Sequence, residues 1–244
     1  MTEHRIVDRA TWQSTRDALL KREKEHTRAG DELARERREL PWVAVEKDYR
    51  FDTEDGPATL ADLFAGRGQL LVYHFMFGPD YRAGCPTNSS MVDGFDGLLP
   101  HLHARDTMMV LVSQAPLAQL LAYRQRMGWR IPWVSAAHTD FNFDFGASAP
   151  VDEVRANLPP EDELPPIVEH NAAATGTDIA RYLTQSPMAT VFARDGATVY
   201  QTYATTWRGL EFLMGYYPIL DRMPRGRDEG AAFQTWLRRH DEYA

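Results

Sequence analysis

Residues 69–90 read QLLVYHFMFGPDYRAGCPTNSS, which is an apolar run, a turn and the single cysteine of the chain in succession. The apolar run, residues 70–77, is typical of a strand that is buried on both faces of a sheet. After a Gly-Pro turn the chain reaches Cys85, and a helix can begin directly behind it. Because the dipole and the free N–H groups of a helix N-terminus stabilise a thiolate, the sequence predicts a lowered pKa and a nucleophilic role for Cys85.

Length and composition bound the class of protein. The 244 residues are 43% hydrophobic, which is enough for one large domain or two small ones. A formal net charge of −8 argues against a nucleic-acid binder, so a small-molecule substrate is the expected partner. One cysteine excludes an intrachain disulfide, and no apolar span of roughly 18 residues predicts a membrane helix or a secretion signal. We expect a cytoplasmic protein without membrane contact, and the sequence has no nucleotide or flavin motif.

The N-terminal part of the chain is dominated by charge. Residues 7–40 alternate acids with bases, and apolar anchors such as Trp12 and Leu33 are sparse. This pattern predicts one or two solvated helices, interrupted near Gly30 and ended by Pro41. Such an arm packs on the body of the protein or on a second subunit, and we expect a homodimer.

The rest of the chain alternates between apolar runs and helical patterns. We expect strands at residues 70–77 and 107–113 and a short strand at 133–136. Helices are expected between and after them, at residues 86–103, 116–128 and 210–217, and a hairpin at residues 188–204 comes before the last helix. Within the hairpin, Asp195-Gly196 is a strong turn signal. This order predicts an α/β protein with a thioredoxin-like fold, in which helices flank a central mixed β-sheet.

The expected domain organisation is simple. We expect residues 1–40 to form a helical arm and residues 41–244 to form the thioredoxin-like domain. Residues 147–186 have a weaker pattern and several prolines, so we expect an insertion or lid there, before the final hairpin.

Several segments carry a resemblance to a known family. They read LPWVAVEKDYRFD, GCPTNSS, DFNFDFGAS and WLRRHDEY, and they resemble the thioredoxin-like domain-of-unknown-function family 899. The resemblance covers nearly the whole chain and implies a dithiol-disulfide oxidoreductase related to peroxiredoxins and thioredoxins. The Cys-Pro-Ser-Cys motif of that family falls on Cys85, Pro86, Thr87 and Asn88, so its second cysteine is missing here. The resemblance thus implies a related oxidoreductase that is not a general dithiol exchanger.

Cys85 still offers chemistry without a second cysteine. A single thiolate can react through a sulfenic acid or a mixed disulfide that an outside thiol resolves. The alternative is a vestigial cysteine. Around it we expect Asn88 and Pro187 to belong to the site, since thioredoxin-like folds place a cis-proline beside the cysteine and Ser186-Pro187 precedes the hairpin.

Histidines offer a second kind of site. His74 and His138 lie near the carboxyl ends of two expected strands, where sites of open α/β sheets are found, and His170 lies in the expected insertion. Imidazoles that converge beside Cys85 would suit a mononuclear copper or iron ion, or zinc. We therefore expect His74, His138 and His170 as candidate metal ligands.

Aromatic residues suggest the kind of substrate. Phe141, Phe143 and Phe145 alternate with polar residues, which is typical of a strand, and with Tyr73 and Trp133 they predict a wall for an aromatic substrate. Three functions stay open. They are a one-cysteine oxidoreductase acting on a small aromatic molecule, a copper- or iron-dependent oxidase or oxygenase, and a non-catalytic binding protein on a degenerate fold.

Overall fold

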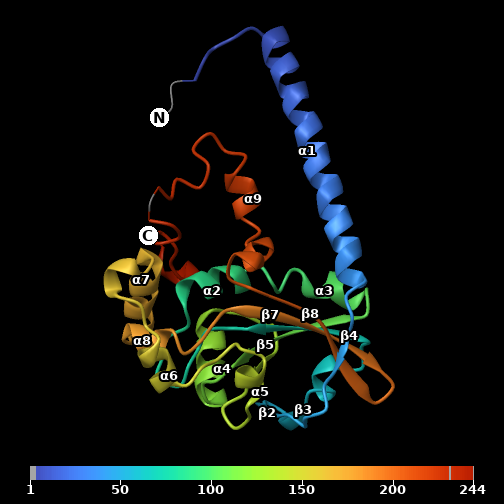
Figure 1. Ribbon diagram of the computed structural model, residues 1–244, viewed down its shortest axis with the longest axis vertical. Helices are drawn as coiled ribbons and strands as arrows, with labels where there is room; N and C mark the ends of the chain where they lie inside the picture. The colour runs from blue at the N-terminus through green and yellow to red at the C-terminus, as the bar shows by residue number, and fades with distance from the viewer. Residues whose placement is uncertain (1–3, 231, 244) are drawn as a thin grey trace. The chain divides into compact units, whose positions relative to one another are not determined.

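The computed structural model of the protein describes residues 4–230 and 232–243 (Figure 1). The chain divides into two compact units, one that ends at Trp42 and one that begins at Val43. No helix in the part of the chain that the structure describes is both long enough and apolar enough to span a bilayer.

The first unit is built on one helix, α1 (Arg9–Arg38). Asp8 begins it as N-cap, because its carboxylate accepts the backbone N–H of Thr11 at 2.9 Å. None of its 30 residues is buried. The predicted interruption near Gly30 is wrong: α1 runs through that position, because one glycine costs a helix only about 1 kcal/mol and good helix formers surround it.

The second unit is organised by an eight-stranded mixed sheet. In chain order the strands are β1 (Val43–Ala44), β2 (Arg50–Thr53), β3 (Gly56–Thr59), β4 (Gln69–His74), β5 (Thr107–Ser113), β6 (Trp133–Ser135), β7 (Met188–Asp195) and β8 (Thr198–Thr206). In the sheet they lie in the order β1-β8-β7-β4-β5-β6-β2-β3. The pairs β4–β5 and β5–β6 are parallel, and β7 is antiparallel to both β4 and β8.

Strand β4 lies at the centre of this sheet and is buried on both faces. Its side chains alternate between two hydrophobic clusters, with Tyr73 in one and Val72 in the other. Its neighbours β5 and β7 pair with it along its whole length. The order β8-β7-β4-β5, with the parallel pair and the C-terminal hairpin, is the thioredoxin arrangement, and the predicted fold class is confirmed.

Helices lie on both faces of the sheet. They are α2 (Pro86–Val92), α3 (Leu99–His103), α4 (Leu117–Arg126), α5 (Phe141–Asp144), α6 (Val151–Ala156), α7 (Pro166–Thr175), α8 (Ile179–Tyr182) and α9 (Tyr217–Leu220), with 3₁₀ turns η1 (Asp62–Phe64), η2 (Glu161–Glu163), η3 (Trp207–Leu213) and η4 (His240–Glu242). Met91 of α2 and Leu120 of α4 belong to the cluster of Tyr73, whereas Phe64 of η1 and Phe141 of α5 belong to that of Val72. The segment expected as an insertion folds into α6, η2, α7 and α8.

The structure corrects three predicted elements besides α1. The helix expected at residues 210–217 is the 3₁₀ turn η3 followed by the start of α9. The helix expected at residues 86–103 is two helices, α2 and α3, separated by turns. The strand expected from Phe141, Phe143 and Phe145 is wrong, because α5 occupies this segment. In a helical turn residues i and i+4 share a face, so Phe141 and Phe145 pack with ring centroids 4.7 Å apart while Phe143 is exposed.

Candidate functional site

Cys85 lies at the N-cap of α2, where the turn that follows β4 delivers it. Its backbone N–H donates to the carbonyl of Met76 at 3.4 Å, which holds the turn against the strand end. The side chain is 0% exposed. Its Sγ lies 3.4 Å from the hydroxyl of Tyr182, which comes from α8 in a distant part of the sequence.

Asn88 occupies the position where the resemblance implied a second cysteine, and it supports the turn. Its Oδ1 accepts two hydrogen bonds, from the backbone N–H of Met76 at 3.2 Å and from the hydroxyl of Tyr73 at 3.0 Å. Asn88 is 1% exposed, and burial raises the pKa of Tyr73 well above its usual value. The amide therefore joins α2 to the end of β4 through two buried donors that a thiol would satisfy poorly.

Tyr182 connects the cysteine to its surroundings. Its hydroxyl accepts from Nδ2 of Asn171 at 3.2 Å, so its own proton can be donated to Sγ of Cys85 at 3.4 Å or to Sδ of Met76 at 3.9 Å. Burial, followed by the nearby Cys85, raises the pKa of Tyr182 well above its usual value. The phenol thus stays protonated and can stabilise negative charge on the sulfur.

Tyr182 also lines a cavity of about 100 Å³. Its polar lining includes Thr87, Asn88 and Asn171, and its apolar lining includes Met76, Ile167, Val168, Met214 and Phe233. Cys85 is not among the lining residues. The aromatic residues expected to form a pocket, Tyr73, Phe141 and Trp133, are buried in the two hydrophobic clusters instead.

Pro187 also lines this cavity, but its peptide bond differs from the expectation. The described residues contain no cis peptide bond, so Ser186-Pro187 is trans and the predicted cis bond is wrong. The chain runs directly into β7 here. The N–H of Ser186 donates to the carbonyl of Ala147 at 2.9 Å, and the carbonyl of Pro187 accepts from Thr206 at 2.6 Å. These two hydrogen bonds hold the segment in place while the Ser186-Pro187 peptide bond is trans.

His74 is buried at the carboxyl end of β4, and both ring nitrogens have partners. Nδ1 lies 3.0 Å from Oδ1 of Asn142 and Nε2 lies 3.0 Å from Oγ1 of Thr190, while the ring stacks on Phe141. Burial lowers the pKa of His74 to about 4. The imidazole is therefore neutral near pH 7 and joins β4, α5 and β7.

The other two candidate ligands lie apart from this histidine. The side chain of His138 is 83% exposed and lies 3.9 Å from Asp52, and Nε2 of His170 accepts from Arg238 at 3.0 Å. Among residues 4–230 and 232–243, no group of three or more His, Cys, Asp or Glu side chains could hold a metal ion. The structure does not bring His74, His138 and His170 together, and copper or iron stays a prediction without a shared set of ligands.

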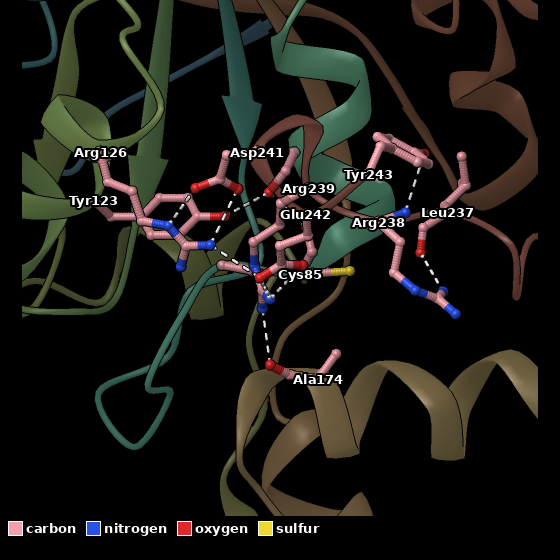
Figure 2. Close-up of polar contacts among 12 residues, drawn as sticks. Cys85, Tyr123, Arg126, Ala174, Leu237, Arg238, Arg239, Asp241, Glu242 and Tyr243 are labelled. Carbon is pink, nitrogen blue, oxygen red and sulfur yellow. Dashed lines mark hydrogen bonds and ion pairs between the residues drawn. The ribbon is translucent and has the colours of Figure 1, made fainter.

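The C-terminal segment, residues 237–243, contributes a contact that the sequence did not predict. Figure 2 shows it beside Cys85. Arg239 is only 4% exposed, and its guanidinium donates to the carbonyl of Gly84 at 2.8 Å and to that of Ala174 at 2.8 Å. It also pairs with Glu242 at 2.8 Å. One arginine thus joins the residue before Cys85 to the end of α7.

A second arginine fixes the same segment to the body of the domain. Arg126 of α4 donates to Asp241 at 2.8 Å and to Glu242 at 2.9 Å (Figure 2). The hydrogen bonds from Arg126 lower the pKa of Asp241. The only signal in the sequence was the charged run WLRRHDEY, and its partners lie more than 100 residues away.

Comparison with solved structures finds folds of the peroxiredoxin kind. Peroxidoxin BcpB from Mycobacterium tuberculosis is 13% identical with a TM-score of 0.43, and the match covers 68% of this chain and 85% of that one. A mutant of peroxiredoxin Q from Xanthomonas campestris is 14% identical with a TM-score of 0.41, covering 64% and 79%. A mitochondrial 1-Cys peroxiredoxin from yeast is 11% identical with a TM-score of 0.40, covering 69% and 68%.

A search of the curated proteins finds no match. Comparison of the sequence with family models does find one. One family model matches residues 1–243, and its description is "Bacterial protein of unknown function (DUF899)". Because the match spans nearly the whole chain, arm and tail included, the protein belongs to the DUF899 family.

Proposed function

We propose that this protein is an oxidoreductase that uses one cysteine, Cys85, and depends on an outside thiol to complete its cycle. The oxidant is a small hydroperoxide or disulfide that enters through the cavity beside Tyr182. The chain has a single cysteine, and Asn88 cannot form a disulfide with it. The second thiol must therefore come from another molecule.

The proposed reaction cycle needs two partners, a hydroperoxide as the oxidant and an outside thiol as the reductant. The Cys85 thiolate attacks the terminal oxygen of a hydroperoxide, an S–O bond forms, the O–O bond breaks, and the alcohol leaves after taking a proton from water. The sulfur is oxidised by two electrons to a sulfenic acid. An outside thiol then forms a mixed disulfide with Cys85 and releases water, and a second thiol restores Cys85 and leaves as a disulfide.

One observation carries this proposal. The hydroxyl of Tyr182 lies 3.4 Å from Sγ of Cys85, and the same side chain lines the cavity. Tyr182 therefore contacts the sulfur and lines the cavity. In the proposed cycle a rotation of Tyr182 opens a path to the thiol, and in its observed position the hydroxyl can donate to the sulfur.

A second candidate is a binding protein without turnover, and the burial of Cys85 favours it. The thiol is 0% exposed and does not line the cavity, although Asn171 and Tyr182 do. In that case the cavity binds a small molecule and the cysteine is a structural residue. The metal-dependent alternative has no shared ligand set among the described residues.

Turnover separates the two candidates. The measurement is consumption of cumene hydroperoxide with glutathione as the reductant, comparing the wild type with Cys85→Ser and Cys85→Ala. We expect the wild type to be at least about 100-fold faster than either variant, because neither retains a thiolate. Equal rates in all three proteins would favour the binding protein.

A further inference from the structure

We infer that a second cavity, formed by the end of α2, by α9 and by residues 236–243, binds a small free molecule that carries a quaternary ammonium group, as choline does. Its volume is about 360 Å³, which lies in the range of about 300–1,000 Å³ that is usual for small-molecule sites. Cys85 is not among its lining residues. The inference therefore goes beyond the proposed function and does not depend on it.

Three aromatic rings form much of the wall of this cavity. They belong to Tyr216, Trp236 and Tyr243. The rings of Tyr216 and Trp236 are nearly perpendicular, with an interplanar angle of 80° and centroids 6.0 Å apart, so aromatic walls bound the cavity in two directions. Tyr243 is 49% exposed, and its hydroxyl accepts from the backbone N–H of Arg238 (Figure 2). Aromatic rings grouped in this way attract quaternary ammonium ions, and Trp does so most strongly.

Negative charge lies beside these rings. Asp93 lines the cavity, and its side chain is 27% exposed. Glu229 accepts from the indole N–H of Trp236 at 2.8 Å, which places a carboxylate at the edge of that ring. Burial raises the pKa of Tyr216 above its usual value, and the charges of Glu229 and Asp93 add to the rise. No lysine, arginine or histidine is among the described residues that line the cavity, so the site favours a cation over an anion.

Two basic side chains lie near this cavity without lining it. Nδ1 of His240 lies 2.6 Å from Oδ1 of Asp93. The guanidinium of Arg238 donates to His170 and to two backbone carbonyls. Because a protonated His240 would offset the charge of Asp93, the binding experiments are made at pH 8.5, where an ordinary histidine is neutral.

The polar groups of the lining already have hydrogen-bond partners, which favours a cation without N–H groups. The hydroxyl of Tyr216 lies 2.7 Å from Oγ of Ser90, which also lines the cavity. Oδ1 of Asp93 accepts from Nε1 of Trp129 at 2.8 Å. The remaining walls are apolar and belong to Ile219, Leu220 and Leu237. A primary ammonium would lose hydrogen bonds to water that this site replaces poorly, whereas a quaternary ammonium has no such bonds to lose.

Direct binding of three small probes tests the inference. Choline carries a quaternary ammonium, 3,3-dimethylbutan-1-ol has the same shape without the charge, and ethanolammonium carries the charge on a primary ammonium. We expect choline to bind the wild type about 10-fold more tightly than either of the others, as measured by calorimetry or ligand-detected NMR at low salt. No binding of choline, or equal binding of the neutral alcohol, would overturn the inference. Ethanolammonium that binds as tightly as choline would overturn the choice of a quaternary cation.

The variant Asp93→Asn tests the contribution of the carboxylate. It keeps an oxygen that can accept from Trp129 and removes the charge, so we expect the advantage of choline over the neutral alcohol to fall to about 3-fold. The matched variant Asp221→Asn removes the same charge from an acid that pairs with Arg227 and does not line the cavity. We expect it to keep the full advantage. Equal effects of the two variants would contradict a local role of Asp93.

The variant Trp236→Leu tests the contribution of the aromatic wall. We expect it to bind choline about 10-fold more weakly and the neutral alcohol less than about 3-fold more weakly. Circular dichroism checks that the variant is folded. If it is not, Tyr243→Leu, which changes an exposed residue near the end of the chain, makes the same test with an expected loss of about 3-fold. Unchanged binding of choline by the folded variant would contradict the aromatic site.

Phosphatidylcholine vesicles distinguish a free ligand from a lipid headgroup. On a lipid the ammonium group is held close to a phosphate, which Asp93 and Glu229 would repel. We therefore expect free choline to bind and the protein not to float with the vesicles in a density gradient. Flotation with the vesicles, without binding of free choline, would overturn the assignment to a free small molecule.

Discussion

At the scale of single residues, Asn88 shows how the structure uses the position of the missing cysteine. Its amide oxygen accepts from a buried backbone N–H and a buried hydroxyl. We expect Asn88→Leu to lower the free energy of unfolding by about 3 kcal/mol, because both donors lose their partner. Tyr73→Phe removes only one bond and should cost about 1 kcal/mol. Urea denaturation measures both, and equal losses would contradict this role of Asn88.

His74 gives the protein a dependence on pH. Its folded pKa of about 4 lies below the usual 6.5, so the unfolded chain binds more protons between these values. Stability from this residue is therefore complete above about pH 6.5 and falls as the pH drops towards 4, by a total on the order of 3 kcal/mol. We expect the ring protons of His74 to show no titration between pH 8 and 5 by NMR. A titration of His74 near pH 6.5 would contradict the buried, neutral state.

At the scale of elements, the sequence predicted those with a strong local pattern. Strand β4 was evident from its apolar run, and the β7–β8 hairpin from Asp195-Gly196, where Gly196 has a φ of +57°. Segment 141–145 is ambiguous in the sequence because three phenylalanines spaced by two fit a strand, while the first and the last of them also fit one face of the helix that forms. Local patterns thus fail where the segment is too short for the two periods to differ.

Helix α1 contains one glycine. Gly30 lies in its C-terminal half, and a Cβ added there would meet nothing within 4 Å. We expect Gly30→Ala to stabilise the helix by about 1 kcal/mol, which slows hydrogen exchange of the neighbouring amides about 5-fold. The reverse change at the preceding position, Ala29→Gly, should speed exchange by a similar factor. Faster exchange in Gly30→Ala would show that the helix is interrupted there after all.

At the scale of the whole molecule, the candidate site depends on segments far apart in the chain. Cys85, Asn171, Tyr182 and Arg239 come together through hydrogen bonds that span up to 155 residues. The sequence could identify Cys85, because its position after an apolar run is a local signal. It could not identify Asn171, Tyr182 or Arg239, since their roles come only from partners that the fold supplies.

The C-terminal segment is held to the rest of the domain by a buried arginine. Arg239 donates to the carbonyls of Gly84 and Ala174, whereas its neighbour Arg238 is exposed. We expect Arg239→Met to lower the free energy of unfolding by about 3 kcal/mol and to speed labelling of Cys85 by a thiol reagent. The matched variant Arg238→Met should cost less than about 1 kcal/mol and leave labelling unchanged. Similar behaviour of the two variants would rule out the role of Arg239 in closing the site.

The most direct test of the central claim, that Cys85 is the redox group, is its rate of oxidation in the folded protein. Wild-type protein is mixed with cumene hydroperoxide, the sulfenic acid is trapped with dimedone, and mass spectrometry follows the adduct over time. We predict complete labelling at Cys85 without denaturant, at a rate above that of free cysteine, because the hydroxyl of Tyr182 can donate to the sulfur and the proposed rotation of Tyr182 admits the oxidant. Labelling that appears only after unfolding in urea would contradict the claim and leave Cys85 as a buried structural residue.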